Sequence, residues 1–269
     1  MDFPSRDSSF CSALEATINQ RYDTTMYDLL TRDFNRGSDY TNYGYWAPGI
    51  DNAKDAGDRL MQELLSAIPA KSGSILDVAC GKGETSKYLT RHYSPARITG
   101  INISEKQLAS CRANVPEAIF LRMDAVSLGF EANAFDAVIC VEAAFHFNTR
   151  QRFLGEALRV LRPGGYLVLS DILVSRDVVR YHGRTVAENF VEGPEHYGSI
   201  LQSVGFLPKS VVDATEPCWH GHFRQAVIFG HEQLLRGRLS SEDLKRRLEV
   251  YYQRLEYTAH YLLVAAQKT

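Results

Sequence analysis

The part of this sequence best suited to bind a ligand is a glycine loop at residues 75–84. It reads Ile-Leu-Asp-Val-Ala-Cys-Gly-Lys-Gly-Glu, so a short apolar run leads through two glycines into a segment with helical spacing. Gly81 and Gly83 lack Cβ atoms where a ligand would touch the backbone, and the helix N-terminus beyond them offers free N–H groups. The loop therefore predicts a ligand that carries a carboxylate or another anionic group.

A dinucleotide is the first alternative ligand for such a loop, and two positions count against it. A dinucleotide site expects a third glycine where this chain has Ser86, and an acidic residue at the end of the second strand where it has Asn102. Recognition of a pyrophosphate and of a ribose 2′-hydroxyl is therefore disfavoured.

A histidine and an aspartate follow two later apolar runs. His146 comes just after residues 134–141, and Asp171 lies at the end of residues 166–172. The carboxyl ends of parallel strands meet at the edge of the sheet that binds ligands, so the two side chains are expected to form a general base and the carboxylate that orients it. The alternative is that His146 only fills the loop between Phe145 and Phe147.

The elements that must position these residues alternate between strands and helices. Strand-length apolar runs are separated by segments of helical period, which predicts an α/β fold with a Rossmann-like, doubly wound and mostly parallel sheet. Residues 258–266 predict an antiparallel last strand. A helical lid is expected over residues 1–48 and a catalytic domain over 49–269, with helical cap insertions at about 173–193 and 215–256. The runs lie at 74–78, 96–103, 118–121, 134–141 and 166–172, and the helices at 84–92, 104–114 and 150–161.

Composition narrows the class of protein further. The 269 residues carry a formal net charge of -2, and their one basic cluster, residues 245–247, is expected to be a solvated helix face. A nucleic-acid partner is therefore not expected. The five cysteines are odd in number and widely spaced, which favours a reducing, cytoplasmic location. No apolar run reaches about 18 residues, so neither a targeting segment nor a membrane partner is expected.

Five motifs in order resemble those of class I S-adenosylmethionine-dependent methyltransferases. They lie at residues 76–83, 99–107, 123–125, 135–138 and 158–165. The resemblance implies S-adenosyl-L-methionine as cofactor and S-adenosyl-L-homocysteine as product. It also implies roles for individual residues: Gly81 and Gly83 against the methionine part, with Asp77 beneath its ammonium group and Glu142 nearby; Asn102, Ile103 and Gln107 at the ribose and adenine; Asp124 and Ala125 at the adenine ring.

Other segments resemble a narrower group, the small-molecule methyltransferases that include sugar O-methyltransferases and tocopherol and sterol methyltransferases. Tyr-Asp at 22–23, Asn-Tyr-Gly-Tyr-Trp at 42–46 and Glu-Ala-Ala-Phe-His-Phe at 142–147 carry this resemblance. In that group N-terminal aromatic residues close over the cofactor. Tyr22, Tyr45 and Trp46 are the matching candidates, and their alternative is an ordinary place in the core of the lid.

The expected reaction is methylation of a small molecule, most simply of a hydroxyl group with His146 as base, in secondary metabolism. N- or C-methylation, and a homologue that binds the cofactor without methyl transfer, are the alternatives. Phe145, Asp213 and Trp219 are candidates for the substrate pocket. No metal is expected, because His182, His196, His220 and His222 lack partners at ligand spacing. Monomer and homodimer both remain open.

Overall fold

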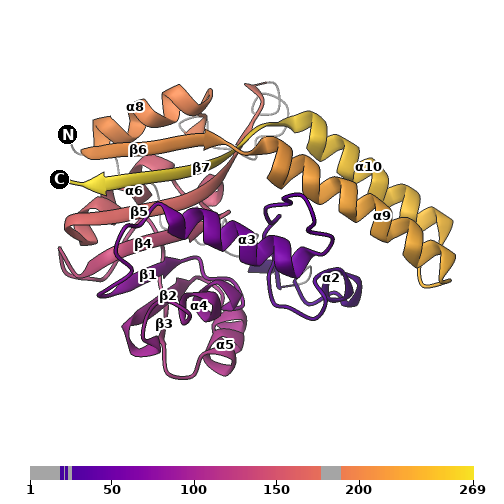
Figure 1. Cartoon of the computed structure of the whole chain (residues 1–269), viewed down its shortest axis with the longest axis horizontal. Coiled ribbons are helices and arrows are strands. Elements are labelled where there is room, and N and C mark those ends of the chain that lie inside the picture. Colours follow the sequence, from indigo (N-terminus) through magenta and orange to yellow (C-terminus); the bar gives the residue numbers. More distant parts are fainter. Residues whose placement is uncertain (1–18, 21, 24–25, 177–188) are drawn as a thin grey trace.

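A single seven-stranded sheet organises the chain (Figure 1). The structure is a computed structural model, and it describes residues 19–20, 22–23, 26–176 and 189–269. The strands lie in the order β3-β2-β1-β4-β5-β7-β6. Their bounds are β1 (Ile75–Val78), β2 (Ile98–Asn102), β3 (Ile119–Arg122), β4 (Phe135–Val141), β5 (Leu161–Val174), β6 (Phe206–Asp213) and β7 (Thr258–Lys268).

The direction of the strands confirms the predicted fold class. Strands β3, β2, β1, β4 and β5 are parallel neighbours, and β7 runs antiparallel between β5 and β6. Every residue of β1 and β2 is buried, as expected for central strands that are covered on both faces. Val78 at the end of β1 pairs with Ile101 and Cys140, so the loops that follow these strands open at one edge of the sheet.

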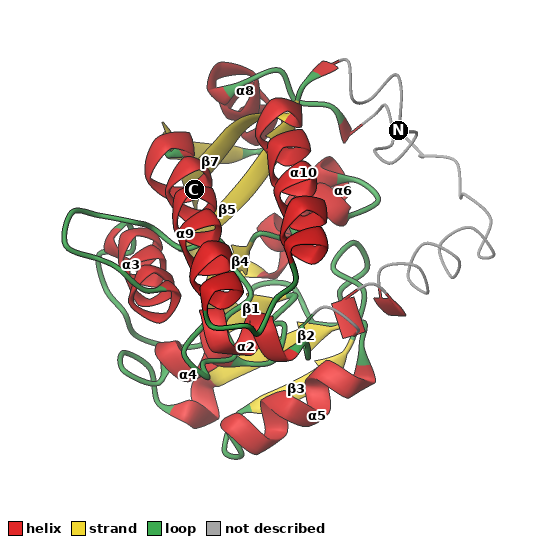
Figure 2. Ribbon diagram, turned by 90° about the vertical axis from the view of Figure 1, so that its right-hand side faces the viewer, coloured by secondary structure: helices red, strands yellow, loops and turns green. Residues whose placement is uncertain are grey.

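Helices cover both faces of the sheet (Figure 2). Apolar residues of α3 pack on one face, and those of α6 and α8 pack on the other, which produces two separate cores. The described helices are α2 (Leu29–Phe34), α3 (Ala53–Ser66), α4 (Glu84–Leu89), α5 (Glu105–Asn114), α6 (Arg150–Val160), α8 (Pro194–Val204), α9 (Gly221–Leu235) and α10 (Ser241–Tyr257), with short turns η1 (Pro95–Arg97), η2 (Ala144–His146) and η4 (Thr215–His220).

Two helix boundaries in the structure can be compared with those expected from the sequence. The helix expected at residues 104–114 is confirmed, and at its start the Ser104 hydroxyl oxygen accepts a hydrogen bond of 3.2 Å from the backbone N–H of Gln107. The helix expected at residues 150–161 is one residue shorter in the structure. Helix α6 already ends at Val160, because Leu161 pairs with Phe135 and begins β5 there.

Helices α9 and α10 form a hairpin that projects from the body of the protein (Figure 1). With η4 they fill the stretch between β6 and β7, where a helical cap was expected at about 215–256. Much of the lid predicted at 1–48 and of the insertion predicted at 173–193 falls outside the described residues, so the domain division remains a prediction. Among the described helices, none combines the length and the apolar character that a membrane span requires.

The glycine loop depends on close packing between α4 and α5. Gly83 caps α4 in the left-handed region at φ 90°, and a Cβ added there would lie 2.9 Å from the Cα of Cys111 in α5. Gly37 has a similar φ of 75°, yet nothing lies within 4 Å of its Cβ position. Substitutions at the two glycines therefore separate the cost of left-handed backbone strain from the cost of crowding against α5.

We predict that Gly83→Ala destabilises the protein by about 2–5 kcal/mol, since left-handed strain and a displaced helix add together. Gly37→Ala is the matched control and should cost only about 1–2 kcal/mol for strain. Urea unfolding of both variants measures the difference. Equal losses would show that the contact with α5 is not tight.

Candidate functional site

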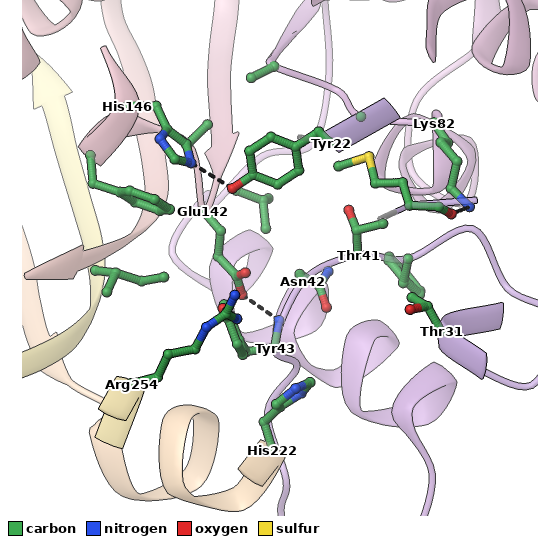
Figure 3. A pocket seen from close by; sticks show the side chains of 18 of the residues that line it. Tyr22, Thr31, Thr41, Asn42, Tyr43, Lys82, Glu142, His146, His222 and Arg254 are labelled. Atoms are coloured by element: carbon green, nitrogen blue, oxygen red, sulfur yellow. Dashed lines mark hydrogen bonds between the residues drawn. The ribbon is translucent and has the colours of Figure 1, made fainter. Parts of the chain in front are cut away.

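A large cavity opens where the parallel strands end. Its volume is about 1910 Å³, above the roughly 300–1,000 Å³ usual for one small ligand, so it has room for two. Its walls come from the loops after β1, β2, β3 and β4, from residues 39–43, and from the hairpin of α9 and α10. Figure 3 shows several of the side chains that point into it.

The loop after β1 forms one wall. Gly81 lines the cavity in the left-handed region at φ 55°, and the nearest atom to its Cβ position is the Thr41 hydroxyl at 3.8 Å. A side chain at residue 81 would therefore stand where a ligand approaches the backbone. Gly83 is not among the residues that line the cavity, and its missing side chain makes room for Cys111. Its expected contact with the ligand therefore stays a prediction.

Asp77 lies beneath this loop and is almost fully buried. Its Oδ2 accepts hydrogen bonds of 2.6 Å from both Thr85 and Ser86, whereas its Oδ1 is buried without a hydrogen-bond partner. Burial raises the pKa of this carboxyl group to about 6. Asp77 is therefore placed under the loop and not on the cavity wall.

The residues expected at a ribose and adenine line the cavity together. The Asn102 amide donates to Gln107 Oε1 at 2.9 Å and to the carbonyl of Gly81 at 3.3 Å. Ile103, Asp124 and Ala125 continue the same wall. The Gln107 amide in turn donates to Asp23 Oδ1 at 3.0 Å, which ties the N-terminal segment to the start of α5. Asp23 is a contact that motif spacing did not single out.

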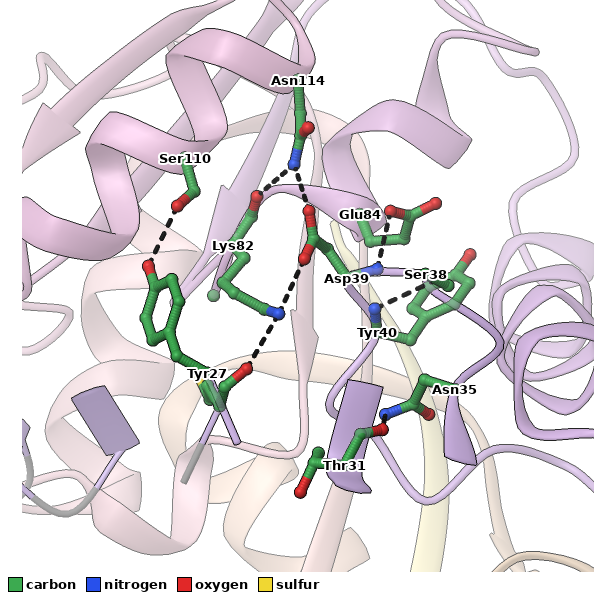
Figure 4. Close-up of polar contacts among 12 residues, drawn as sticks. Tyr27, Thr31, Asn35, Ser38, Asp39, Tyr40, Lys82, Glu84, Ser110 and Asn114 are labelled. Atoms are coloured by element: carbon green, nitrogen blue, oxygen red, sulfur yellow. Dashed lines mark hydrogen bonds and ion pairs between the residues drawn. The ribbon is translucent and has the colours of Figure 1, made fainter. Parts of the chain in front are cut away.

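A second anchor joins the N-terminal segment to the glycine loop (Figure 4). The Lys82 ammonium, which is largely buried, lies 2.7 Å from Asp39 Oδ1 and donates to the Met26 carbonyl at 3.0 Å. Asn114 of α5 donates to Asp39 Oδ2 and to the carbonyl of Lys82, both at 2.9 Å. Sequence reasoning treated Lys82 only as a loop residue, because its partner lies 43 positions away and no motif links the two.

Glu142 follows β4 with an unusual backbone, at φ 54°, and lines the cavity. Its Oε1 accepts a hydrogen bond of 2.7 Å from the backbone N–H of Tyr43 (Figure 3). It also accepts one of 2.6 Å from the Tyr261 hydroxyl. Burial raises the pKa of this carboxyl group to about 8. Glu142 is therefore mostly protonated at neutral pH.

Tyr43 lines the cavity, whereas Tyr45 and Trp46 were the aromatic residues expected there. The Tyr45 ring lies under the Arg59 guanidinium at 5.8 Å and faces away from the cavity. Trp46 is 9% exposed and packs against Ala53 and Ala56. Neither is among the residues that line the cavity, so the expectation that they close over a cofactor gains no support from this geometry and stays a prediction. The chain turns at residues 43–46, and only one of the three rings can face inward.

His146 and Tyr22 meet at the cavity. The Tyr22 hydroxyl lies 2.6 Å from His146 Nε2, and the two rings are nearly perpendicular (Figure 3). Phe145 stacks beside the imidazole with ring centroids 4.1 Å apart, and it lines the cavity as expected. The edge of the sheet thus presents a histidine nitrogen next to a hydroxyl oxygen.

Asp171 does not orient this histidine, and the expected pair is wrong. The carboxylate is 0% exposed and accepts hydrogen bonds from Arg150 Nε at 2.7 Å and from the Tyr197 hydroxyl at 3.0 Å. Its Oδ1 also accepts from the backbone N–H of Ile172. A buried arginine is a stronger partner than a neutral imidazole, and nothing near Asp171 in the sequence revealed it.

The remaining candidates divide between the cavity and the surface. Trp219 lines the cavity as expected. Asp213 is the last residue of β6, contacts His260 at 2.7 Å and is not among the residues that line the cavity, so its expected place there is wrong. His220 contacts Glu216 on the surface, whereas His222 lines the cavity. His182 lies outside the described residues. Within the part of the chain that the structure describes, no group of side chains is arranged to hold a metal ion.

The comparisons of sequence match this chain to methyltransferases. The family model described as a methyltransferase domain matches residues 76–169. The phthiotriol/phenolphthiotriol dimycocerosates methyltransferase of Mycobacterium tuberculosis is 30% identical over 70% of this chain and 73% of its own length. The 27-O-demethylrifamycin SV methyltransferase of Amycolatopsis mediterranei is 31% identical over 66% and 71%.

Solved structures share the fold at lower identity. The [4+2]-cyclase SpnF superposes with a TM-score of 0.70 at 22% identity, covering 94% of this chain and 96% of that one. A geranyl diphosphate C-methyltransferase from Streptomyces coelicolor A3(2), crystallised with S-adenosyl-L-homocysteine, has a TM-score of 0.68 at 16% identity, with 95% and 98% covered.

We predict that Glu142→Gln stabilises the ligand-free protein increasingly as the pH rises from 5 to 8. The folded protein keeps a proton on Glu142 that the unfolded chain releases above its ordinary pKa of 4.5, so stability is lost through this window. The amide can still accept from Tyr43 and Tyr261. The gain should grow by at most about 1.4 kcal/mol per pH unit. Urea unfolding at each pH measures it, and a gain independent of pH would contradict the raised pKa.

We predict that Asp171→Asn destabilises the protein by about 3–5 kcal/mol, because it leaves the charge of Arg150 buried without a counter-ion. Asp213→Asn removes an exposed carboxylate and should cost less than about 1 kcal/mol. Thermal and urea unfolding compare the two. A loss for Asp171→Asn no larger than that of the control would return Asp171 to consideration as a partner of His146.

Proposed function

The chain belongs to the class I S-adenosylmethionine-dependent methyltransferases that act on small molecules, and on this premise we propose that it methylates a hydroxyl group with His146 as general base. One observation carries the proposal. His146 Nε2 lies at the cavity, 2.6 Å from a hydroxyl oxygen, that of Tyr22. An acceptor hydroxyl at the same place would be within reach of the base.

The cavity fits the cofactor in its polar chemistry. Asn42 lines the cavity, and both ends of its amide are buried without a hydrogen-bond partner among the described residues. We infer that Asn42 and Gly81 hold the amino-acid end of S-adenosyl-L-methionine, while Asn102 and Asp124 hold the ribose and adenine. When bound, this cofactor supplies an electrophilic methyl group on a sulfonium.

The residues of the chain then have two tasks. The first is to align the acceptor oxygen with the methyl carbon and to exclude water, which supplies much of the rate of a displacement reaction. Tyr22 and Phe145 lie beside the imidazole and give that place aromatic surface. The second is to take the proton from the acceptor hydroxyl, for which the unprotonated Nε2 of His146 is suited near neutral pH.

The acceptor itself is proposed to be a secondary metabolite. Two relatives support this by name, the 27-O-demethylrifamycin SV methyltransferase and the methyltransferase GfsG of Streptomyces halstedii, which is 28% identical over 78% of this chain and 80% of its own length. The aromatic residues around His146 suit an acceptor that is mainly apolar.

We predict that His146→Ala lowers turnover by about 10²–10⁴-fold and leaves cofactor affinity nearly unchanged. Tyr22→Phe is the control, since it keeps the imidazole and removes only the hydroxyl in front of it. S-adenosyl-L-homocysteine release measures turnover over a panel of hydroxylated acceptors that includes 27-O-demethylrifamycin SV, and calorimetry measures cofactor binding.

Two results would argue against this assignment. Wild-type turnover in His146→Ala would exclude the base and favour an amine or carbon acceptor. An equal loss in Tyr22→Phe would mean that the proton leaves through the tyrosine hydroxyl and not directly to the histidine.

A further inference from the structure

One face of α9 forms a long wall of the cavity that the reaction itself does not explain. Five of its residues line the cavity at helical spacing: His222, Ala226, Phe229, Gly230 and Gln233. Eleven residues separate the first from the last, so the wall is about 16 Å long. This length exceeds what the transfer of one methyl group needs.

The wall is polar at its two ends. His222 Nδ1 and Gln233 Oε1 are buried, and neither has a hydrogen-bond partner among the described residues. Gln233 is 1% exposed. Burial lowers the pKa of His222 to about 3, so its ring is neutral at working pH. A hydrogen bond to the backbone of Tyr43 acts against burial and raises this pKa. Nδ1 has no partner among the described residues, so we assign the proton of the neutral ring to the other nitrogen and the acceptor role to Nδ1.

The middle of the wall is apolar. Ala226 and Gly230 offer little more than backbone surface, and Phe229 packs against Phe34 with ring centroids 5.3 Å apart. Val250 and Tyr251 of α10 face the same space. A ligand that lies along α9 therefore meets an acceptor atom, then apolar surface, then a second acceptor atom.

A buried acceptor without a donor is costly, and a ligand hydroxyl would remove that cost. We propose that α9 recognises an elongated, mainly apolar methyl acceptor about 16 Å long that carries a hydroxyl group near each end, one bound by His222 Nδ1 and the other by Gln233 Oε1. This rests on the proposed function only in assigning this side of the cavity to the acceptor.

The facing helix supplies a competing recognition by charge. Arg247 and Arg254 of α10 line the cavity, and neither pairs with a carboxylate among the described residues, although Arg254 donates to the Tyr43 hydroxyl at 3.0 Å. Arg246 is paired with Asp243 at 2.8 Å. An acceptor with anionic ends would use these arginines instead of the neutral groups on α9.

Binding to the protein loaded with S-adenosyl-L-homocysteine tests the proposal with simple probes. The diol 1,12-dodecanediol spans the wall and has a donor at each end, and 1,12-dimethoxydodecane has the same length without donors. We expect the diol to bind at least about 10-fold more tightly, as two hydrogen bonds of ordinary strength would give. Fluorescence of Trp219, which lines the cavity, follows the titration.

Variants identify the two acceptor atoms. His222→Phe and Gln233→Leu should each lower the preference for the diol by about 2–10-fold, whereas His222→Asn keeps an acceptor and should retain part of it. Gln225→Leu changes the same helix outside the cavity and is the matched control. Melting curves and cofactor affinity establish that each variant is folded before its preference for the diol over the dimethoxy compound is measured.

Several outcomes would overturn the proposal. Equal affinity for the diol and the dimethoxy compound would show that the residues of α9 do not bind hydrogen-bond donors on the ligand. A preference for dodecanedioic acid over the diol would assign recognition to the arginines of α10. A preference unchanged in both His222→Phe and Gln233→Leu would place it elsewhere. These binding measurements need no methyl transfer, so they fail or succeed independently of the test on His146.

Discussion

The carboxyl group of Glu142, at the end of β4, joins the parts of the chain that build the cavity. Glu142 receives hydrogen bonds from the backbone of Tyr43 and from the hydroxyl of Tyr261. These partners belong to the N-terminal segment and to β7, which are separated by more than 200 positions. Burial raises the pKa of this carboxyl group, and the neutral form needs no counter-ion at the cavity wall.

Tyr43 extends that junction to the acceptor side of the cavity. Its ring contacts Trp219 and His222, with centroids 4.4 and 4.7 Å apart, and its hydroxyl accepts from Arg254. One residue therefore links the carboxyl group of Glu142 to the helices proposed to recognise the acceptor. The Lys82 and Asp39 ion pair holds the same segment against the glycine loop from the other side.

The sequence was informative where a motif reports on its own backbone. The glycine loop, the capping serine and the alternation of strands with helices predicted the sheet and the wall that contains Asn102 and Gln107, since these features depend on neighbours a few positions apart. The sequence was not informative for side chains whose partners lie many positions away along the chain. Asp171 looked free to orient His146 because the partners that bind it, Arg150 and Tyr197, lie 21 and 26 positions away.

The directions of the aromatic rings could not be predicted from the sequence for a related reason. Tyr43, Tyr45 and Trp46 are equivalent by composition, and the direction of each ring is decided by packing against α3 and η4, which no local pattern encodes. Gly83 was assigned to the ligand because glycine loops serve ligands, yet its lack of a side chain serves the packing of α5. Types and spacing thus located the site, while tertiary contacts decided which side chains enter it.

The place of the α9 and α10 hairpin in the chain has a consequence for how such proteins diversify. The hairpin leaves the sheet after β6 and returns through β7, and these two strands pair with each other along their length. Its base is therefore closed, so helices can be lengthened, shortened or exchanged there without shifting the register of β1, β2 and β4. The architecture separates the hairpin, which we propose meets the acceptor, from the strands that position the glycine loop.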